Sequence, residues 1–112
     1  MKRIGMVGKL KADKVDHYIT LHEHTWPAVL ARNRDCHLQN YSIFYKPMPN
    51  GEHWLFGYVE YVGDDFDADM AKLAADPQIQ KWWDECKPCF EQFEPMPAGE
   101  VWAPMRSVFY QP

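Results

Sequence analysis

Three residues with side chains suited to chemistry recur at the spacing of a helical turn. Tyr18, His22 and Trp26 stand at positions i, i+4 and i+8, along one stripe of an α-helix that continues to Trp26. A half-buried histidine between two aromatic rings can transfer protons near neutral pH, where imidazole changes charge. The same position also suits a packed histidine that bonds a backbone group, and the spacing alone favours that second interpretation.

A pair of adjacent tryptophans and one tyrosine are the next candidates. Neighbours on a helix point about 100° apart, so Trp82 and Trp83 cannot both face the core, and one should line a pocket or an interface. Indole faces stack well on the apolar face of a pyranose. Tyr41, between Asn40 and Ser42, can offer its phenol to a sugar hydroxyl, relay a proton, or simply pack in a sheet.

Other chemistry-bearing patterns carry less weight. Cys86 and Cys89 form a C-x-x-C, but redox motifs of that kind open a helix after a buried strand, whereas this pair closes a helix. A zinc site needs four ligands, and the histidines match no metal-binding spacing. Glycine-rich phosphate loops are also missing from the sequence. We therefore expect neither a metal nor a cofactor.

The composition is that of one folded, acidic domain. With 46% hydrophobic and 25% charged residues, residues 1–112 suffice for one core and not for two. A net charge of -4 offers nucleic acid no electrostatic footprint, and no apolar run is long enough to span a membrane. The start of the chain has no sustained apolar segment, and the cysteines are odd in number, so we expect a cytoplasmic protein.

Local patterns also predict the elements that must position these residues. Period-two alternation predicts strands at residues 3–10, 37–45, 52–61 and 101–110. Capping residues and helical periodicity predict helical segments at residues 13–26 and 27–34, from Asp64 onward, and at residues 76–90. Asn50-Gly51 is a strong turn signal that joins the two middle strands as a hairpin. Pro104 must bulge the last strand or confine it to an edge.

This β-α-β-β-α-β order is that of the ferredoxin-like α+β fold, an antiparallel sheet with helices on one face. Strict alternation along the second strand puts Tyr41, Ile43 and Tyr45 on one face and Leu38 and Phe44 on the other. Both faces of the hairpin are therefore apolar, but helices cover only one of them. We expect a second copy to cover the other face in a homodimer, with a ligand cavity between sheet and helices.

Four segments in register carry a resemblance to a known family. They are Tyr18-x-x-x-His22-x-x-x-Trp26-Pro27, Asn40-Tyr41-Ser42-Ile43, Gln80-Lys81-Trp82-Trp83 and Val108-Phe109-Tyr110-Gln111-Pro112. Because they span most of the chain, the sequence is similar to the L-rhamnose mutarotase family. The resemblance implies a dimeric α+β barrel and an enzyme without a cofactor that interconverts the α and β anomers of a deoxy-sugar. It also implies that His22 is the proton donor and that the sugar is held by Tyr18, Tyr41, Trp82 and Trp83.

Two departures from the family pattern leave the substrate open. Ala28 follows the Trp-Pro pair where members usually carry an acidic residue, and the hairpin turn at residues 46–52 is longer than in short members. L-fucose or another sugar is thus an alternative to L-rhamnose. The base that complements His22 is unassigned, and a water bound to Tyr41 is one candidate. A cofactor-free dimeric α+β-barrel monooxygenase and a ligand-binding barrel without turnover are the other open classes.

Overall fold

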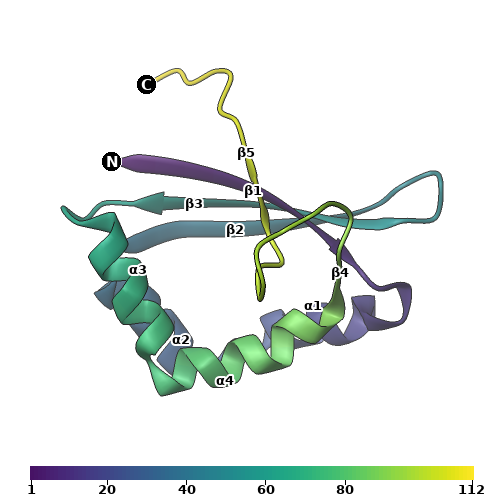
Figure 1. The fold of residues 1–112 in the computed structure, drawn as a ribbon, viewed down its shortest axis with the longest axis horizontal. Helices are drawn as coiled ribbons and strands as arrows, with labels where there is room; N and C mark the ends of the chain where they lie inside the picture. The colour runs from purple at the N-terminus through teal and green to yellow at the C-terminus, as the bar shows by residue number, and fades with distance from the viewer.

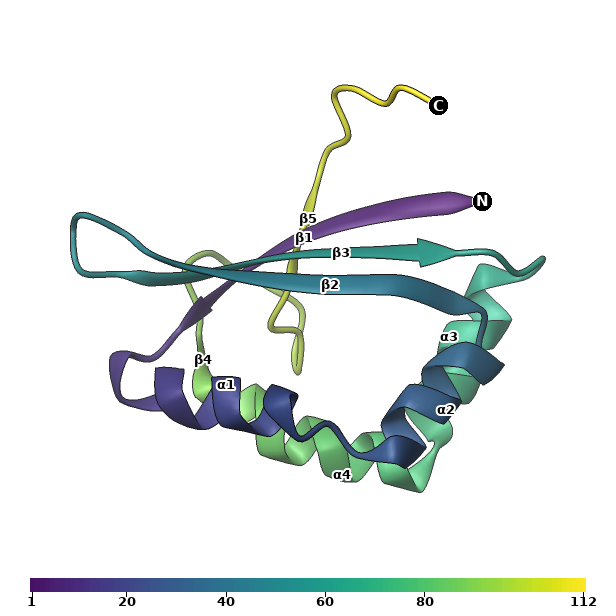
Figure 2. The same ribbon diagram turned by 180° about the vertical axis from the view of Figure 1, so that it is seen from behind.

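An antiparallel sheet with all the helices on one of its faces makes up the structure (Figures 1 and 2). The computed structural model describes residues 1–112. The strands are β1 (Lys2–Leu10), β2 (Leu38–Pro47), β3 (His53–Tyr61), β4 (Phe90–Glu91) and β5 (Ala103–Met105). The helices are α1 (Val15–Glu23), α2 (Pro27–Asp35), α3 (Phe66–Ala75) and α4 (Pro77–Cys86), with short 3₁₀ turns η1 (Ala12–Lys14) and η2 (Lys87–Cys89). None of these helices is long and apolar enough to cross a membrane.

The strand order confirms the predicted ferredoxin-like fold. The strands lie in the order β2-β3-β1-β4, and β5 also pairs with β1. β1 is therefore central, between the hairpin strand β3 and the short strands near the C-terminus, and all its pairings are antiparallel. Two helices follow β1 and two follow β3, so the helices form a second layer that packs on the sheet (Figure 1).

The central hairpin forms as its sequence predicts. β2 and β3 pair antiparallel along most of their length. In the turn between them, Gly51 adopts a φ of 87°, which glycine reaches without steric cost. The Asn50 side chain accepts a hydrogen bond from the backbone N–H of Glu52 at 3.0 Å. These two residues therefore set the point of chain reversal.

Aspartates begin the two later helices, also as predicted. At the start of α3 the Asp65 side chain accepts a backbone hydrogen bond at 3.1 Å. At the start of α4 the Asp76 side chain accepts from the N–H groups of Gln78 and Ile79 at 2.9 and 3.2 Å. Carboxylates at these positions satisfy free N–H groups and oppose the positive end of the helix dipole. Asp76 also accepts from Arg32 Nε at 2.7 Å, which ties α4 to α2.

Two predictions about the first helix are wrong. Asp13 does not cap it, because Asp13 lies in η1 and Lys14 occupies the N-cap position without a side-chain cap. The helix also stops before Trp26. It ends at Glu23, and His24 leaves helical geometry with a φ of -124° and a ψ of 41°. Trp26 then takes the extended backbone that a residue before proline favours. Tyr18 and His22 therefore lie on α1, whereas Trp26 lies at the start of α2.

The last predicted helix and strand are both shorter than expected. α4 ends at Cys86, and the chain tightens into η2 around Pro88, whose ring nitrogen has no N–H to continue the helix. Phe90, predicted as helix, begins β4 and pairs with β1. Within residues 101–110 only Ala103–Met105 pairs with β1, and the residues that follow form no regular element.

A β-bulge also makes the predicted faces of the second strand wrong. The pairing of β2 with β3 shifts register partway along the strand. Asn40 has a φ of 50° there, a left-handed backbone that asparagine tolerates. Because of the extra residue, Leu38 belongs to the core, and Ile43 and Tyr45 pack against that core. All three side chains therefore lie on the inner face of the sheet. Strict alternation had separated Leu38 from the other two.

The inner face of the sheet and the helices enclose the core. Leu10 of β1, Leu55 of β3 and Ile79 of α4 are each at most 2% exposed, and burying one such side chain contributes about 1.5–3 kcal/mol. The core thus joins the hairpin, the central strand and the last long helix.

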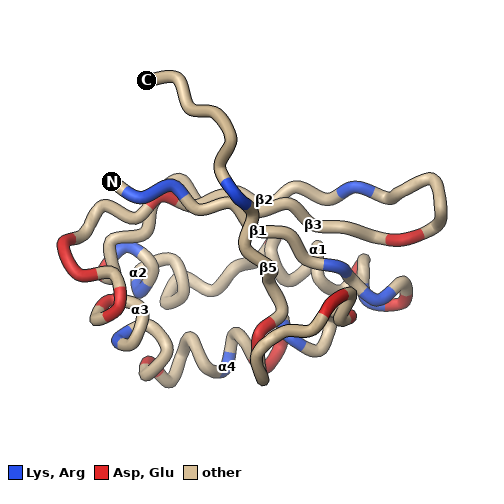
Figure 3. The backbone as a smooth tube through the Cα atoms, turned by 45° about the horizontal axis from the view of Figure 1, so that its top comes forward, with Lys and Arg blue, Asp and Glu red and all other residues tan.

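The outer face of the sheet carries apolar side chains that no helix covers. Phe44 is 66% exposed and Met105 is 41% exposed, and Phe44 lies opposite Phe56 in the ladder of β2 with β3. No charged residue lies in the middle part of β1, β2 or β3 (Figure 3). Beyond β5 the chain runs away from the sheet, on the side opposite the helices (Figure 2), with Val108 and Phe109 about as exposed as free side chains.

Candidate active site

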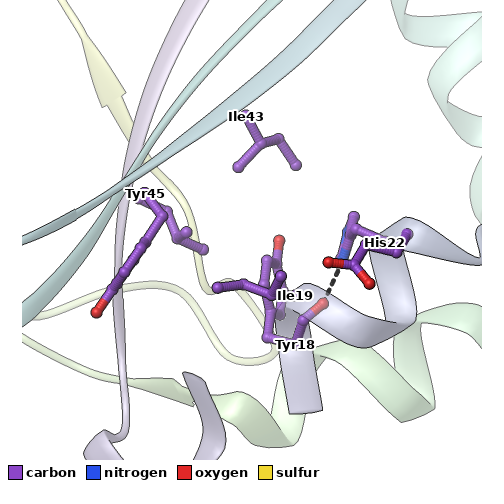
Figure 4. Close-up of a pocket in the computed structure, with 7 residues that line it drawn as sticks. Tyr18, Ile19, His22, Ile43 and Tyr45 are labelled. Carbon is purple, nitrogen blue, oxygen red and sulfur yellow. Dashed lines mark hydrogen bonds between the residues drawn. The ribbon is translucent and has the colours of Figure 1, made fainter. Parts of the chain in front are cut away.

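A cavity opens between α1 and the central hairpin, where the sequence predicts a ligand site between sheet and helices. Its volume is about 340 Å³. Tyr18 and His22 rise from α1, and Ile43 and Tyr45 lie on the strand wall opposite them (Figure 4). The lining residues, five of which are hydrophobic, are Tyr18, Ile19, His22, Glu23, Ile43, Tyr45 and Leu55.

His22 is held in one tautomer by its own helix. Its Nδ1 lies 2.8 Å from the backbone carbonyl oxygen of Tyr18. A carbonyl only accepts, so we assign the ring proton to Nδ1, and the neutral ring keeps a free lone pair on Nε2. Burial lowers the pKa of His22 below its usual 6.5, against the smaller opposing effect of this hydrogen bond. At neutral pH the ring is therefore uncharged, with Nε2 able to accept a proton.

Aromatic rings surround the imidazole. The Tyr18 ring lies 4.2 Å from the His22 ring, centroid to centroid. The Trp82 ring lies 5.1 Å from His22 and 5.2 Å from Trp26, both edge to face. Tyr18, His22 and Trp26 therefore belong to one cluster in space, although Trp26 is outside α1. Such contacts restrict the ring positions of His22.

Tyr18 and Tyr41 place protonated phenols in the interior. Burial raises the pKa of Tyr18 strongly, and the neighbouring Cys86 and Tyr41 raise it further. Burial also raises the pKa of Tyr41. Tyr41 is 43% exposed as a residue, but its hydroxyl points inward and lies 4.0 Å from Met6 Sδ. Of the two, Tyr18 lines the cavity and Tyr41 does not.

The adjacent tryptophans diverge as helical neighbours must. Trp82 is buried at 6% exposure and backs His22 from the core side of α4. Trp83 is half-buried, packs against the core and has Lys87 Nζ 4.8 Å from its ring. Neither ring lines the cavity, so the structure brings Tyr18 and His22 to the lining and sets Trp82 behind them.

Sequence reasoning missed five lining residues. Ile19 and Glu23 stand four residues apart on α1, and this spacing would have placed them beside the stripe of Tyr18 and His22. Ile43, Tyr45 and Leu55 come from paired strands, so their place at the cavity depends on the bulge and the register. The Tyr45 hydroxyl is hydrogen-bonded to His53 Nδ1 at 2.7 Å, which holds this ring in the strand wall.

The three cysteines are free and buried. Burial raises the pKa of Cys86 to about 12, and it also raises the pKa of Cys89 and of Cys36. The thiols are therefore protonated at neutral pH and pack as small apolar side chains. No three His, Cys, Asp or Glu side chains are grouped closely enough to hold a metal ion.

Fold and site together define a ferredoxin-like α+β protein whose helix–sheet cavity presents one histidine with a free ring nitrogen. A sequence profile described as L-rhamnose mutarotase matches residues 3–111. The L-rhamnose mutarotase of Oceanobacillus iheyensis is 35% identical over 88 residues, which are 79% of this chain and 79% of that one. The chain belongs to the L-rhamnose mutarotase family and is an isomerase of the mutarotase class.

Two solved structures share the fold. L-rhamnose mutarotase FA22100 from Formosa agariphila superposes with a TM-score of 0.74 at 25% identity, over 99% of each chain. Tetracenomycin F2 cyclase from Streptomyces glaucescens superposes with a TM-score of 0.62 at 14% identity, over 100% of each chain. The second likeness concerns the fold alone. Family membership therefore favours the mutarotase over the monooxygenase and the barrel without turnover.

Proposed function

We propose that this enzyme interconverts the α and β anomers of L-rhamnose in the cavity between α1 and the hairpin, with His22 as the proton-transfer residue. The observation that carries the proposal is the hydrogen bond from His22 Nδ1 to the Tyr18 carbonyl oxygen at 2.8 Å. It leaves Nε2 as the free nitrogen of an uncharged, cavity-lining imidazole. Such a group can take a proton from a bound hydroxyl.

One imidazole suffices, because the two sugar oxygens that exchange the proton are bonded to the same carbon. Nε2 takes the proton of the anomeric O1–H, the C1–O5 bond breaks with its electron pair passing to O5, and the C1=O1 double bond forms. The imidazolium then returns the proton to O5. After rotation about C1–C2 the steps run in reverse, and O5 attacks the other face of C1. His22 thus acts first as base and then as proton donor, without a separate complementary base.

A phenol and an apolar wall suit a deoxy-sugar. The raised pKa of Tyr18 keeps its hydroxyl protonated, so we assign Tyr18, which lines the cavity, to donate a hydrogen bond to a sugar oxygen. Tyr41 lies outside this lining, and its contact with the sugar rests on the family resemblance alone. Ile43 and Leu55 on the strand wall offer apolar surface to the methyl group of a 6-deoxy sugar. This surface supports L-rhamnose over a sugar with a hydroxymethyl group.

The two tryptophans enter the proposed site differently. Trp82 packs on His22 at 5.1 Å, so we assign it to orient the imidazole from behind the cavity lining. Trp83 lies outside the cavity lining, and its contact with the sugar rests on the family resemblance alone.

We also propose that two copies pair through the outer face of the sheet and that the enzyme works in the cytoplasm. Exposed Phe44 and Met105 lie on this uncovered face, and apolar patches of this kind mark interfaces. A twofold dimer would cover the patch of each copy with that of the other. Three unlinked cysteines suit a reducing compartment. Light scattering should give the mass of two chains.

Saturation transfer between the α and β anomeric protons of L-rhamnose tests the reaction. We expect the enzyme to exchange them faster than buffer does, and to exchange those of L-fucose more slowly. Faster exchange of L-fucose would contradict the substrate assignment. Quenching of tryptophan fluorescence by L-rhamnose without faster exchange of any sugar would contradict the mutarotase mechanism.

A further inference from the structure

We propose that Glu23 determines which sugars the cavity accepts, by binding two adjacent ring hydroxyls through its carboxylate. This inference rests on the proposed function, since it concerns the same cavity. It assigns Glu23 to substrate recognition and leaves proton transfer to His22. The ligand class is a neutral sugar with an intact pair of adjacent hydroxyls on one edge and an apolar group on the opposite edge.

The composition of the lining isolates Glu23. Besides His22 and Glu23, the polar groups of the lining are the hydroxyls of Tyr18 and Tyr45, and that of Tyr45 is hydrogen-bonded to His53. Nδ1 of His22 is occupied by a backbone carbonyl, and Nε2 is needed at the anomeric carbon. Glu23 is then the one carboxylate left to accept from the other ring hydroxyls. Its two oxygens can accept from two neighbouring hydroxyls at once, and such charge-assisted bonds are stronger than neutral ones.

Glu23 is an exposed residue whose carboxylate has no ion-pair partner. Glu23 is the last residue of α1, where the negative end of the helix dipole disfavours a carboxylate. Asp76, by contrast, is paired with Arg32 at 2.7 Å and begins a helix. The Glu23 carboxylate is therefore free to accept hydrogen bonds from a ligand in the cavity that it lines.

The two walls give the cavity a direction. Glu23 belongs to the α1 wall, and Ile43 and Leu55 belong to the strand wall. A sugar between them directs its hydroxyl edge to Glu23 and its apolar edge to the strands. A sugar acid would set a second negative charge near Glu23, and the repulsion between the two charges would disfavour its binding.

The test compares Glu23→Ala and Glu23→Gln with Glu85→Ala. Glu85 is an exposed residue of α4 outside the cavity lining, so its variant is the matched control. KM and kcat come from saturation transfer over a range of L-rhamnose concentrations, and from analogues that each lack one ring hydroxyl. Circular dichroism verifies that each variant is folded.

We expect Glu23→Ala to raise the KM for L-rhamnose about ten- to hundredfold and to change kcat by less than about threefold. Glu23→Gln should raise KM less, because its amide oxygen still accepts. For the wild type, the two analogues that lack a hydroxyl bound by Glu23 should have a higher KM than L-rhamnose. For Glu23→Ala, the KM of these two analogues should equal that of L-rhamnose. An unchanged KM in both variants, or a fall in kcat at unchanged KM, would overturn the assignment. Absence of exchange by the wild type would instead contradict the proposed function itself.

Discussion

The surroundings of His22 and His37 differ in a way that residue types alone do not reveal. His37 has a carboxylate partner, since its Nδ1 lies 2.9 Å from Asp69 Oδ2, and Asp69 also accepts from the Tyr61 hydroxyl at 2.5 Å. His22 has only the Tyr18 carbonyl. By composition, the Tyr61–Asp69–His37 cluster looks better equipped for proton transfer. It nevertheless lies outside the lining of the cavity.

The cluster around Asp69 joins elements of the fold. Asp69 belongs to α3 and Tyr61 ends β3, and His37 precedes β2. The Tyr61 hydroxyl also accepts from the backbone N–H of Asp65 at 2.9 Å, at the start of α3. His22, by contrast, is half-buried among aromatic rings and faces a cavity. The comparison teaches that access to a cavity and a free ring nitrogen, rather than a carboxylate partner, distinguish the histidine that we propose transfers the proton.

The largest expected effect separates the two histidines directly. His22→Ala should lower the rate of anomer exchange about 10²–10⁴-fold, the usual contribution of a general acid–base residue. His37→Ala should leave the rate within about twofold, because it lies away from the cavity. Saturation-transfer NMR on L-rhamnose measures both. A similar loss of exchange rate in His37→Ala would contradict the proposed difference between the two histidines.

Trp82, which packs on His22, should contribute more to the free energy of unfolding than Phe66, which packs in the cluster of His37. Trp82→Ala should lower the free energy of unfolding by about 3–5 kcal/mol, because Trp82 is buried at 6% exposure. Phe66→Ala should cost less, because Phe66 is only half-buried where it packs on Tyr61 at 5.1 Å. Urea denaturation measures both, with Trp82→Phe as the control that keeps a ring. A larger loss for Phe66→Ala would contradict this ranking.

Acid should affect the two regions in different pH ranges. Burial lowers the pKa of His22 below 6.5 in the folded protein. As the pH drops below about 6.5, the unfolded chain therefore binds a proton at His22 more readily than the folded protein does, and the free energy of unfolding falls. Exchange should fall about tenfold per pH unit once the pH is below the folded pKa. Hydrogen bonds, first from Tyr61 and then from His37, lower the pKa of Asp69 below 3.8, so its contribution is present above that value and lost at lower pH.

Rate and denaturation midpoints measured between about pH 3 and 8 would resolve these two ranges. His22→Ala should remove the change in stability below about pH 6.5 and keep the change below about pH 3.8 that is due to Asp69. Exchange that speeds up on acidification would show that the protonated imidazole starts the reaction, contrary to the tautomer assigned to His22.

The smallest expected effect concerns the tyrosines. Tyr18→Phe removes a cavity hydroxyl but keeps the backbone carbonyl that holds His22, so KM should rise about two- to tenfold, with kcat nearly unchanged. Tyr61→Phe should leave both constants unchanged and lower stability instead. Kinetics and urea denaturation of the two variants test this. A large loss of kcat in Tyr18→Phe would indicate that its hydroxyl transfers a proton.

Much of the fold was predictable because its signals are local. Asp65 and Asp76 begin helices by bonding N–H groups two or three residues onward, and Asn50-Gly51 reverses the chain within the turn. The predicted cap at Asp13 failed because a 3₁₀ turn intervenes before α1. Tyr18 and His22, on one helix, were found for the same local reason, whereas the lining residues of the strands, such as Tyr45, were not.

The sequence by itself determined that Tyr18 and His22 share one face, because residues four apart on a helix are neighbours whatever surrounds them. Only the tertiary structure decided that this face borders a cavity, that Trp82 backs the imidazole, and that Ile43 and Tyr45 form the opposite wall. Those placements depend on a bulge at Asn40 and on pairing between strands far apart in the chain. A register shift of one residue would turn the side chains of β2 to the other face, and no local pattern could fix that choice.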